Sequence, residues 1–583
     1  MKEEDEGSIK SWFVPFTTTK AITFIILIGL SVYFNVFFNG FVWDDKSYII
    51  NYPQVHSVDL INSFKPNLFN TGSQYRPIPV VYFSTLYSLF NTQPFFYHFL
   101  QILIHIVNSV ILFLILKHFF SKAPSFLLSL VFLVHPINVE SVAYIGASGN
   151  PLFFLFGSVA LLTSLKKKLD FRIVPLVSFF LLLALLTKET AILFALIILT
   201  YTYIFKKKWL LMQFIATIGS IAAYALIRFG IGGIFFEKLE LTSVARLTFI
   251  QRLANIPAVV FYYLKTFLYP DKLSIGQDWI IKEITFESFY LSIIIEIILL
   301  FLLFYIVTFL YIKRRKGFKV FIFFLVWFLG GLILHSQIVA LDWTVADRWF
   351  YFTLAGLAGV TGIILENFTP KKMKILTTII LALVIGLLSI RTIERNTNWK
   401  DAITLYEHDT KIYQTWDLEN NLGAEYKYIG NQEKALEHYL YSVDIFPFET
   451  NLLNVGIVYG NLGNTIKAME YFYKAYNAKS YARGHKRSLI TYQNLVQTLL
   501  ISKEPEKAEA ILEEAVADYP ESSVMWVLVA ITKQRLDKDT DASSAAKRAL
   551  ELQNDDLSGY IYKKIQDNSK IEIIPEINSV KFL

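Results

Sequence analysis

Apolar stretches of about 20 residues follow one another through the first two thirds of this chain. A helix of roughly that length crosses the hydrocarbon core of a bilayer. Because lipid offers an open backbone no hydrogen-bond partners, each stretch is predicted to be a transmembrane helix. We expect about eleven spans, at residues 20–39, 96–116, 124–143, 150–165, 173–188, 189–205, 209–228, 288–312, 320–340, 346–366 and 373–391.

Basic residues gather between these stretches, and their distribution predicts the orientation of the chain. With a cytoplasmic N-terminus, all five basic clusters fall on the cytoplasmic side, as the positive-inside rule requires. Topology then explains the net charge of +7 better than nucleic-acid binding does. The clusters are Lys117 with Lys122, Lys166–Arg172, Lys206–Lys208, Lys313–Lys316 and Lys371–Lys374.

Two apolar segments are assigned differently from the rest. Residues 255–270 are short, contain a lysine and carry a proline near each end. A crossing there would move the cluster at 313–316 outside, so we expect a re-entrant or interfacial helix. The first apolar run lacks a small-residue cleavage site, so we expect a retained span rather than a removed signal peptide.

Beyond Trp399 the composition changes to that of soluble helices, rich in Glu, Lys, Asn and Ala. A period close to 34 residues matches the tetratricopeptide (TPR) pattern, in which small residues let paired helices approach and large ones fill the gap between them. We expect about four copies, whose concave face would bind an extended peptide; a passive spacer is the alternative. Matching positions include Gly423, Tyr426, Ala435, Tyr439 and Pro447, then Gly456, Tyr459, Ala468 and Phe472.

The predicted fold class is therefore all-α, a polytopic helix bundle followed by an α-solenoid. We expect a cytoplasmic tail at 1–19 and a membrane domain at 20–398 with a long outer loop at 40–95. The repeat domain would occupy 399–566, and the tail at 567–583 is unassigned. The expected location is the cell (inner) membrane, with the repeats extracytoplasmic.

Candidate site residues begin in the long outer loop. Asp44 and Asp45 lie just past the first span, where paired acids suit a general base, a metal ligand or an anchor for sugar hydroxyls. A helix cap with solvated charges is the alternative. Arg76 suits a phosphate, although arginines at membrane surfaces also anchor to lipid headgroups.

Further ionisable residues recur at span ends on the same side. His135 and Glu140 flank a helix break at the outer leaflet, where charged groups are usually functional and capping is the alternative. Lys188 suits a phosphate, with neutralisation by the adjacent Glu189 as the alternative. Arg348 lies within an aromatic belt, so simple anchoring competes. Together these residues predict an outward-facing cavity for an anionic, lipid-linked substrate.

Several chemistries are excluded by what the sequence lacks. It has no cysteine, so disulfides, thiolate metal sites and cysteine nucleophiles are ruled out. It also contains no Walker A loop, no His-Glu-x-x-His motif and no Gly-x-Ser-x-Gly motif.

Nearly the whole chain resembles a known family. FVWDD, SQYRPIPVVYFSTLYSLF, HPINVESVAYIGASGN, TKETAILF, ADRWFYFTLAG and RTIERNTNWKDAITLY occur in that order before the repeats. They are similar to motifs of the transmembrane and TPR repeat-containing O-mannosyltransferases, which are glycosyltransferases with the GT-C fold. The segment YIGASGN departs from the family's Gly-Arg-Ala-Asp-like stretch, which leaves the identity of the donor and its sugar open.

The resemblance implies a polyprenyl-phosphate sugar donor, a protein hydroxyl as acceptor and a catalytic base at Asp44 or Asp45. It maps the family's substrate residues onto Arg76, His135, Glu140, Lys188 and Arg348. No cofactor is expected, and a metal is possible without being required. The alternatives are a transferase acting on lipid or polysaccharide, and a non-catalytic membrane scaffold that recruits partners through its repeats.

Overall fold

The computed structural model describes residues 16–71, 74–166, 170–235, 242–478, 486–567, 569 and 571. The chain divides into two compact units, Met1–Tyr413 and Gln414–Leu583. The sequence analysis placed this boundary at 398/399, and the structure places it later because residues 399–413 pack with the first unit. Most of the expected tails at 1–19 and 567–583, together with Lys167 and Lys168, lies outside the described residues.

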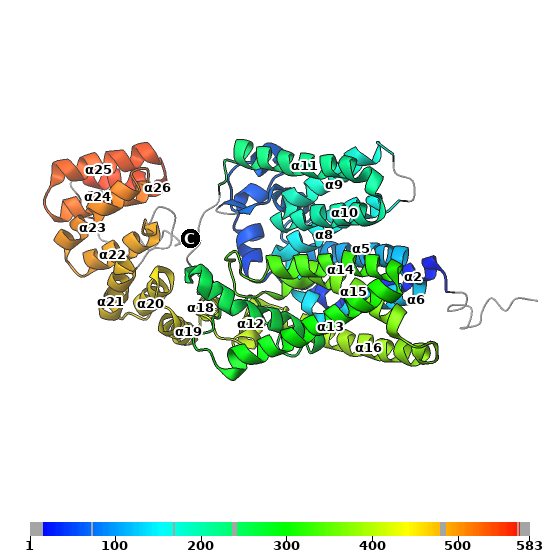
Figure 1. Ribbon diagram of the computed structural model, residues 1–583. Coiled ribbons are helices and arrows are strands. Elements are labelled where there is room, and N and C mark those ends of the chain that lie inside the picture. Colours follow the sequence, from blue (N-terminus) through cyan, green and yellow to red (C-terminus); the bar gives the residue numbers. More distant parts are fainter. Residues whose placement is uncertain are drawn as a thin grey trace, which may run out of the picture. The chain divides into compact units, whose positions relative to one another are not determined.

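Helices build most of the described part of the first unit, together with one small sheet and the non-helical segments 269–285 and 335–346 (Figure 1). Its helices are α2 (Thr18–Val32), α3 (Leu60–Ser63), α4 (Pro77–Phe90), α5 (Pro94–Phe119), α6 (Lys122–Val134), α7 (Val139–Ala143), α8 (Gly149–Ser164), α9 (Ile173–Thr187), α10 (Ile192–Phe205), α11 (Leu210–Leu226), α12 (Phe249–Leu268), α13 (Leu291–Lys313), α14 (Arg315–Leu334), α15 (Phe350–Phe368), α16 (Lys374–Asn398) and α17 (Ala402–Asp409).

Short 3-10 and π turns extend or join these helices. The 3-10 turns are η1 (Phe34–Phe38), η3 (Pro53–Val55), η4 (Pro136–Asn138), η5 (Ile145–Ser148), η6 (Glu189–Ala191), η7 (Lys207–Trp209), η9 (Val244–Arg246), η11 (Asp347–Trp349) and η12 (Lys371–Met373). The π turns are η2 (Lys46–Ile50), η8 (Ile227–Ile231) and η10 (Phe286–Tyr290).

Every predicted span overlaps one helix or two consecutive helical segments, and the protein is a multi-pass membrane protein. Among the described residues, seven helices are long and apolar enough to cross a membrane, or eight if the bent pair α6 and η4–α7 counts as one span. The segments at α2, α9 and η6–α10 are shorter apolar helices. The segment 255–270 belongs to α12, which is not among these candidate spans, and its interfacial placement stays a prediction.

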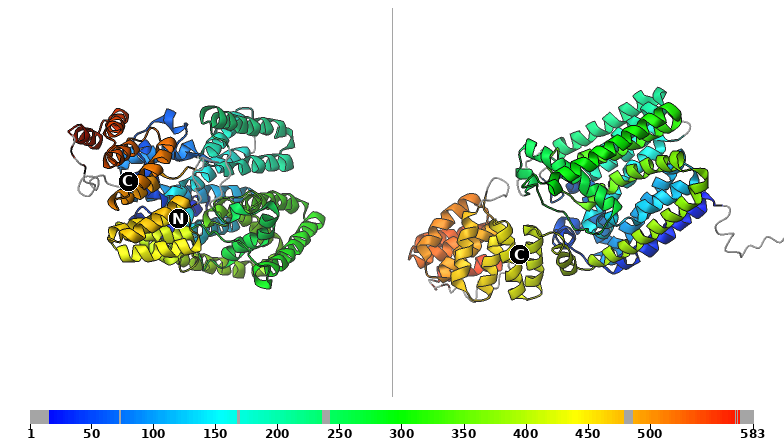
Figure 2. Two further views of the ribbon diagram at one scale, coloured as in Figure 1. Left: turned by 90° about the vertical axis from the view of Figure 1, so that its left-hand side faces the viewer. Right: turned by 60° about the horizontal axis from the view of Figure 1, so that its bottom comes forward.

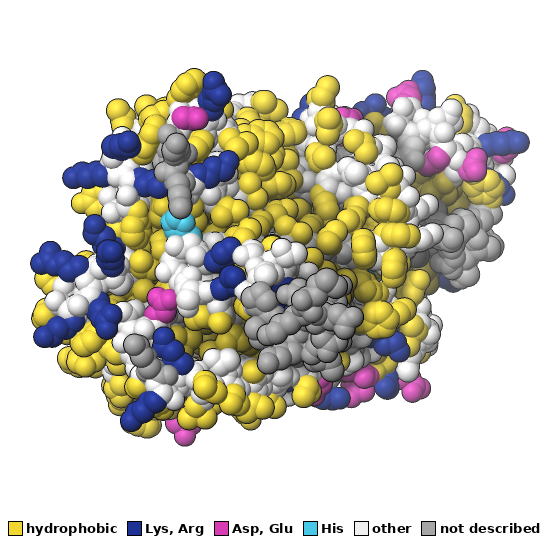
Figure 3. Space-filling model, turned by 90° about the vertical axis from the view of Figure 1, so that its right-hand side faces the viewer, with side chains coloured by type: hydrophobic (Ala, Val, Ile, Leu, Met, Phe, Trp, Pro, Cys, Tyr) yellow, Lys and Arg dark blue, Asp and Glu magenta, His cyan; other side chains and the backbone are white. Residues whose placement is uncertain are grey.

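The basic clusters share one end of the first unit, which we call the lysine-rich end (Figure 3). Lys117 Nζ donates to Thr18 Oγ1 at 2.7 Å, and Lys206 Nζ reaches the carbonyl of Ser164 at 3.5 Å. The rings of Phe309 and Phe368, near the two later clusters, lie 4.9 Å apart. Helix α5 has 26 residues and is therefore about 39 Å long, enough to separate this end from the opposite one across a bilayer.

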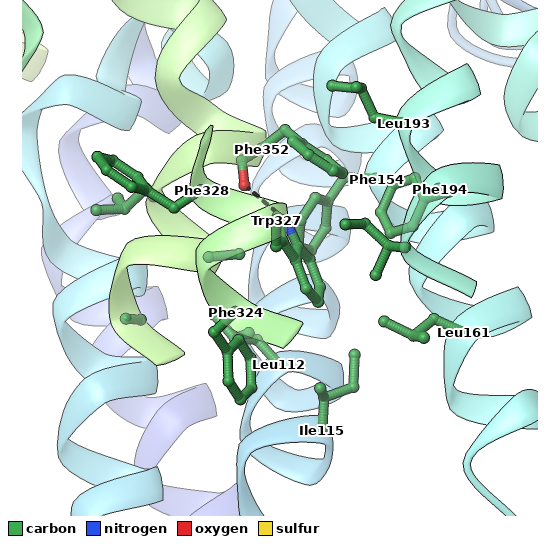
Figure 4. Close-up of a cluster of buried hydrophobic side chains, with 14 of the residues drawn as sticks. Leu112, Ile115, Phe154, Leu161, Leu193, Phe194, Phe324, Trp327, Phe328 and Phe352 are labelled. Carbon is green, nitrogen blue, oxygen red and sulfur yellow. Dashed lines mark hydrogen bonds between the residues drawn. The ribbon is translucent and has the colours of Figure 1, made fainter. Parts of the chain in front are cut away.

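Aromatic side chains fill the centre of the bundle (Figure 4). Trp327 on α14 is fully buried, and its Nε1 donates to the carbonyl of Phe352 on α15 at 3.0 Å. Gly359 lets these two helices touch, because a Cβ there would lie 1.9 Å from the ring of Phe324. This packing holds the span ends, and the side chains they carry, in fixed positions.

The segment predicted as a long outer loop at 40–95 is folded. It contains η2, η3, α3, the 14-residue helix α4 and an antiparallel pair of strands, β1 (Asn70–Thr71) and β2 (Gln74–Tyr75). Proline is the first residue of α4, where its missing N–H costs nothing. Ordered structure here gives the acidic pair at 44–45 a rigid support.

A buried ion pair joins α17 to the end of α16. Arg395 Nη1 and Nη2 donate to the two carboxylate oxygens of Asp409 at 2.8 and 3.1 Å, and both side chains are at most 2% exposed. The backbone N–H of Ile275 donates to the same carboxylate at 2.8 Å. Burial alone would raise the pKa of Asp409, but the guanidinium of Arg395 lowers it below its ordinary value. This pair explains why residues 399–413 belong to the first unit.

Asp409→Ala is expected to destabilise the first unit by about 3–5 kcal/mol, because it leaves the Arg395 guanidinium buried without a counter-ion. The measurement is the apparent Tm of the purified protein in detergent. Asp401→Asn is the matched control, since asparagine also caps the start of α17. Equal Tm values for Asp409→Ala and the wild type would contradict this account.

The second unit is a row of helical hairpins (Figure 2). Its helices pair as α18 (Trp416–Tyr428) with α19 (Gln432–Ile445), α20 (Glu449–Asn461) with α21 (Thr465–Asn477), α22 (Leu489–Ile501) with α23 (Pro505–Asp518), and α24 (Ser523–Arg535) with α25 (Asp539–Leu552), and α26 (Asp556–Gln566) follows them.

The hairpins pack as the repeat pattern predicts. A Cβ on Gly423 would lie 2.8 Å from the ring of Tyr439, and one on Gly456 would lie 2.5 Å from the ring of Phe472. Small residues at these positions therefore allow the close approach of the paired helices. Gly430 and Gly463 adopt φ values of +85° and +77° in the first two hairpin turns, a backbone region that glycine enters without strain.

Candidate active site

The acidic pair lies at the end of the first unit opposite the lysine-rich end, under an aromatic stack. Trp43 has a φ of +52°, a strained value for a non-glycine residue, and its ring stacks on Tyr144 at 5.1 Å. Tyr144 stacks in turn on Trp399 at 5.8 Å, and its hydroxyl donates to Asp44 Oδ2 at 3.0 Å. Burial raises the pKa of Asp44, against the opposing effects of Tyr144 and the charge of Arg348.

The two aspartates differ sharply in their surroundings. Asp45 is fully buried, and its two oxygens accept backbone N–H bonds from Val42 at 3.1 Å and Gly146 at 2.6 Å. Asp44 is half-buried, with its carboxylate beside the aromatic stack. Asp45 therefore ties the loop to η5, whereas Asp44 remains partly exposed.

Arg348 is held from two directions. Its backbone N–H donates to Glu140 Oε2 at 2.8 Å, and its Nη1 forms an ion pair with Glu140 Oε1. Its guanidinium carbon lies 5.4 Å from the centre of the Trp43 ring. Glu140 is 3% exposed and Arg348 15% exposed. Glu140 thus orients the arginine, and the arginine is the partner that can reach an anion.

Glu189 pairs with arginines and not with the adjacent lysine. Arg76 Nε donates to Glu189 Oε2 at 3.0 Å, and Arg228 Nη1 lies 3.7 Å from Oε1. The backbone N–H of Tyr75 donates to Oε1 at 2.6 Å. Direct pairing of Glu189 with Lys188, the alternative considered from the sequence, is not found; Glu189 instead fixes β2 against the turn between α9 and α10. Arg228 was missed by the sequence analysis, although an arginine inside an apolar run is a usable signal.

Lys188 forms no ion pair with a carboxylate in the described part of the chain. Its Nζ donates to Asn150 Oδ1 and lies 6.0 Å from the ring of Phe153. Burial, followed by the charges of Arg76 and Arg348, holds the pKa of Lys188 well below its ordinary value. The neighbouring cations Arg76, Lys188 and Arg348 together make a region that attracts an anion.

Tyr48 and Asp342 also belong to this group of interacting residues, although no sequence pattern marks them. Burial raises the pKa of Tyr48, and the charges of Asp44, Arg76, Arg348 and Asp342 all act on it. Tyr48 therefore lies among all four charged groups. Tyr48 and Asp342 carry no signal in the sequence, because neither stands in a paired-charge motif or at a helix break. We call Asp44, Tyr48, Arg76, Lys188, Asp342 and Arg348 the charged cluster.

His135 lies outside the charged cluster. Its Nδ1 accepts the backbone N–H of Ile137 at 3.2 Å, and its Nε2 bonds to the carbonyl of Phe267 at 3.0 Å. The ring is fully buried, so it caps the break after α6 and attaches the end of α12. Asp347 is similarly occupied, since it accepts a bond from the Tyr262 hydroxyl at 2.7 Å. Within the described residues, no three His, Asp or Glu side chains form a group that could hold a metal ion.

The chain is similar in sequence to one protein-family model and to several known proteins. Residues 450–480 match the family model for the tetratricopeptide repeat. The chain is 26% identical over 477 residues to protein O-mannosyl-transferase TMTC3 of Homo sapiens, covering 73% of this chain and 52% of that protein. A protein O-mannosyl-transferase of Caenorhabditis elegans is 24% identical, covering 73% and 62%.

The chain spans about half the length of the human relative. Its resemblance to the transmembrane and TPR repeat-containing O-mannosyltransferases is confirmed, and it is a relative of that family. Among solved structures, it is similar to the oligosaccharyltransferase of Archaeoglobus fulgidus, at 15% identity and a TM-score of 0.39, covering 67% of this chain and 56% of that one. It is also similar to the TPR protein YrrB, at 15% identity and a TM-score of 0.25, covering 31% and 100%.

Proposed function

We propose that this relative of the O-mannosyltransferases moves a hexose, such as mannose, from a polyprenyl-phosphate carrier to a Ser or Thr hydroxyl of a protein. The observation that carries the proposal is that the charge of Arg348 acts both on a half-buried carboxylate, Asp44, and on a second cation, Lys188, at one end of the bundle. The lysine-rich end lies opposite. By the positive-inside rule the charged cluster then faces the extracytoplasmic side of the cell membrane, with the N-terminus cytoplasmic.

The proposed chemistry is a single displacement. Asp44 accepts the proton of the acceptor hydroxyl while the hydroxyl oxygen bonds to the anomeric carbon. The bond from that carbon to the phosphate oxygen breaks, and negative charge grows on the departing lipid phosphate. Arg348 and Lys188 stabilise this charge, and stabilisation that is stronger in the transition state than in the ground state accelerates the reaction. The polyprenyl tail remains among the membrane lipids.

The remaining candidates act by positioning. Glu140 orients Arg348, Glu189 orients Arg76, and Asp45 fixes the loop that carries Asp44. We propose that no metal is required, because a donor linked through a single phosphate leaves less charge to neutralise than a pyrophosphate-linked donor does. The concave face of the hairpin array would hold the acceptor protein.

Intact-mass glycoproteomics of extracytoplasmic proteins tests this function, in cells with the wild-type chain, without the chain and with residues 416–555 deleted. Loss of hexose-sized mass from proteins in the null cells supports a protein glycosyltransferase. Loss in the deletion as well, with the first unit still inserted, supports acceptor binding by the repeats. Unchanged protein glycans in all three would overturn the proposal and favour a lipid or polysaccharide acceptor, or a scaffold.

Donor binding is expected to weaken as the pH rises through the lowered pKa of Lys188. The folded-state pKa lies below the ordinary 10.5, so the ammonium loses its charge at a pH where other lysines keep theirs. The measurement is the Kd of a polyprenyl phosphate for the full-length protein in nanodiscs as a function of pH.

Lys188→Arg is the control for this prediction, because a guanidinium stays charged throughout that range. Its binding curve should be flat where that of the wild type falls. The same fall with pH in Lys188→Arg would assign the titration to another group.

A further inference from the structure

A groove of about 590 Å³ opens on the lipid-facing side of the bundle, close to the lysine-rich end and away from the charged cluster. Its volume is in the range of ligand pockets. Helices α10, α11 and α14 form its walls. All its lining side chains except Thr200 are apolar or aromatic: Leu199, Tyr203, Ile204, Leu210, Leu211, Phe214 and Ile322.

Within the described residues of the first unit, side chains that line this groove stay exposed. Leu211 is 70% exposed, Tyr203 is 61% exposed and Phe214 is 49% exposed. In a membrane these side chains meet the acyl chains of one leaflet. The groove therefore has the shape and chemistry to hold a hydrocarbon chain in a defined place rather than against a smooth helix surface.

Lysines stand at the mouth of the groove. Lys207 and Lys208 occupy the turn between the last lining residue of α10, Ile204, and the first of α11, Leu210. Lys319 lies one helical turn from Ile322 on the same side of α14, toward the membrane surface. In the described residues, none of these three lysines is paired with a carboxylate, and all three are exposed.

A fourth lysine is already occupied by the fold. Lys206 Nζ lies 3.5 Å from the carbonyls of Ser164 and Leu165 and also bonds to the carbonyl of Lys166. It therefore closes the end of α8. Its three neighbours at the mouth are the ones that can meet an anionic headgroup.

We propose that this groove binds one anionic phospholipid of the leaflet at the lysine-rich end. An acyl chain occupies the apolar groove, and Lys207, Lys208 and Lys319 hold the phosphate above it. Basic pockets between transmembrane helices bind anionic headgroups in this way, and the positive-inside rule places the site in the cytoplasmic leaflet. The site is separate from the proposed transfer reaction and does not depend on it.

Native mass spectrometry of the full-length protein tests the site, after release from nanodiscs of phosphatidylcholine with a minor fraction of phosphatidylglycerol. The wild type is expected to retain one phosphatidylglycerol. In K207Q/K208Q/K319Q the affinity for that lipid should fall by about a hundredfold, as expected for three lysines at a membrane surface. Ile322→Trp, which fills the groove and keeps every charge, should lower retention as well.

Two matched controls separate a site from a diffuse positive surface. K313Q/K372Q/K374Q removes the same charge from exposed positions at the same end, away from the groove. Leu302→Trp adds the same bulk to a lipid-exposed position on α13. Both should retain the lipid as the wild type does. Equal loss in the charge control, or full retention in either K207Q/K208Q/K319Q or Ile322→Trp, would overturn the proposal.

Discussion

Asp44→Asn is expected to lower the rate of sugar transfer by about a hundredfold or more, the contribution typical of a general base. The amide keeps an oxygen that can accept the Tyr144 hydroxyl bond, so the stack of Trp43 on Tyr144 should persist. What the variant loses is a group able to take the acceptor's proton. The measurement is the initial rate with a polyprenyl-phosphate hexose, together with the apparent Tm.

Asp45→Asn provides the contrast, because that side chain accepts two backbone N–H bonds in a fully buried place. The new NH₂ group faces one of those N–H donors, so this variant should be less stable than the wild type. Any fall in its transfer rate should follow from that loss of stability. If Asp44→Asn transfers sugar at the wild-type rate, the assignment of Asp44 as the base is wrong.

Arg348→Gln is expected to have the second large effect, a loss of transfer of about 10²–10³-fold, as for other groups that stabilise a developing negative charge. The variant also leaves Glu140 buried and unpaired, which should cost about 3–5 kcal/mol of stability. The two losses have different origins: one concerns the leaving phosphate and the other the fold.

The double variant Glu140→Gln/Arg348→Gln separates these origins. With both charges removed, no unpaired ion remains in the core, so the apparent Tm should recover most of its loss. Transfer should stay as low as in Arg348→Gln. Recovery of activity together with stability would show that Arg348 serves only the fold.

The fold was largely predictable from the sequence because its signals are strong and repeated. Apolar length located every helix that the analysis named, and the spacing of Gly423, Tyr439, Gly456 and Phe472 located the repeats. The boundary between the units was harder. It depends on the ion pair between Arg395 and Asp409, which lie 14 residues apart on two helices, and no local pattern reports such a pair.

The charged cluster was predictable only in outline. Asp44, Lys188 and Arg348 are marked by their place at span ends, and in the structure the charge of Arg348 acts on both of the others. The partners of these residues depend on contacts between distant segments. Tyr48 gives no signal because it is one aromatic residue among many. His135 lies in a recognisable motif, but both its ring nitrogens are hydrogen-bonded to backbone groups. Sequence position predicts at which end of the bundle a side chain lies and leaves its hydrogen bonds undetermined.

The stack of Trp43, Tyr144 and Trp399 can form only late in the synthesis of the chain. Trp43 and Trp399 are separated by 356 residues (399 minus 43), which a ribosome adds in about 20–70 s at about 5–20 residues per second. Throughout that interval Asp44 is already synthesised while the last ring of its support does not yet exist. The proposed base therefore reaches its final setting only after the last span is made, and we expect a chain terminated before Trp399 to insert in the membrane but to transfer no sugar.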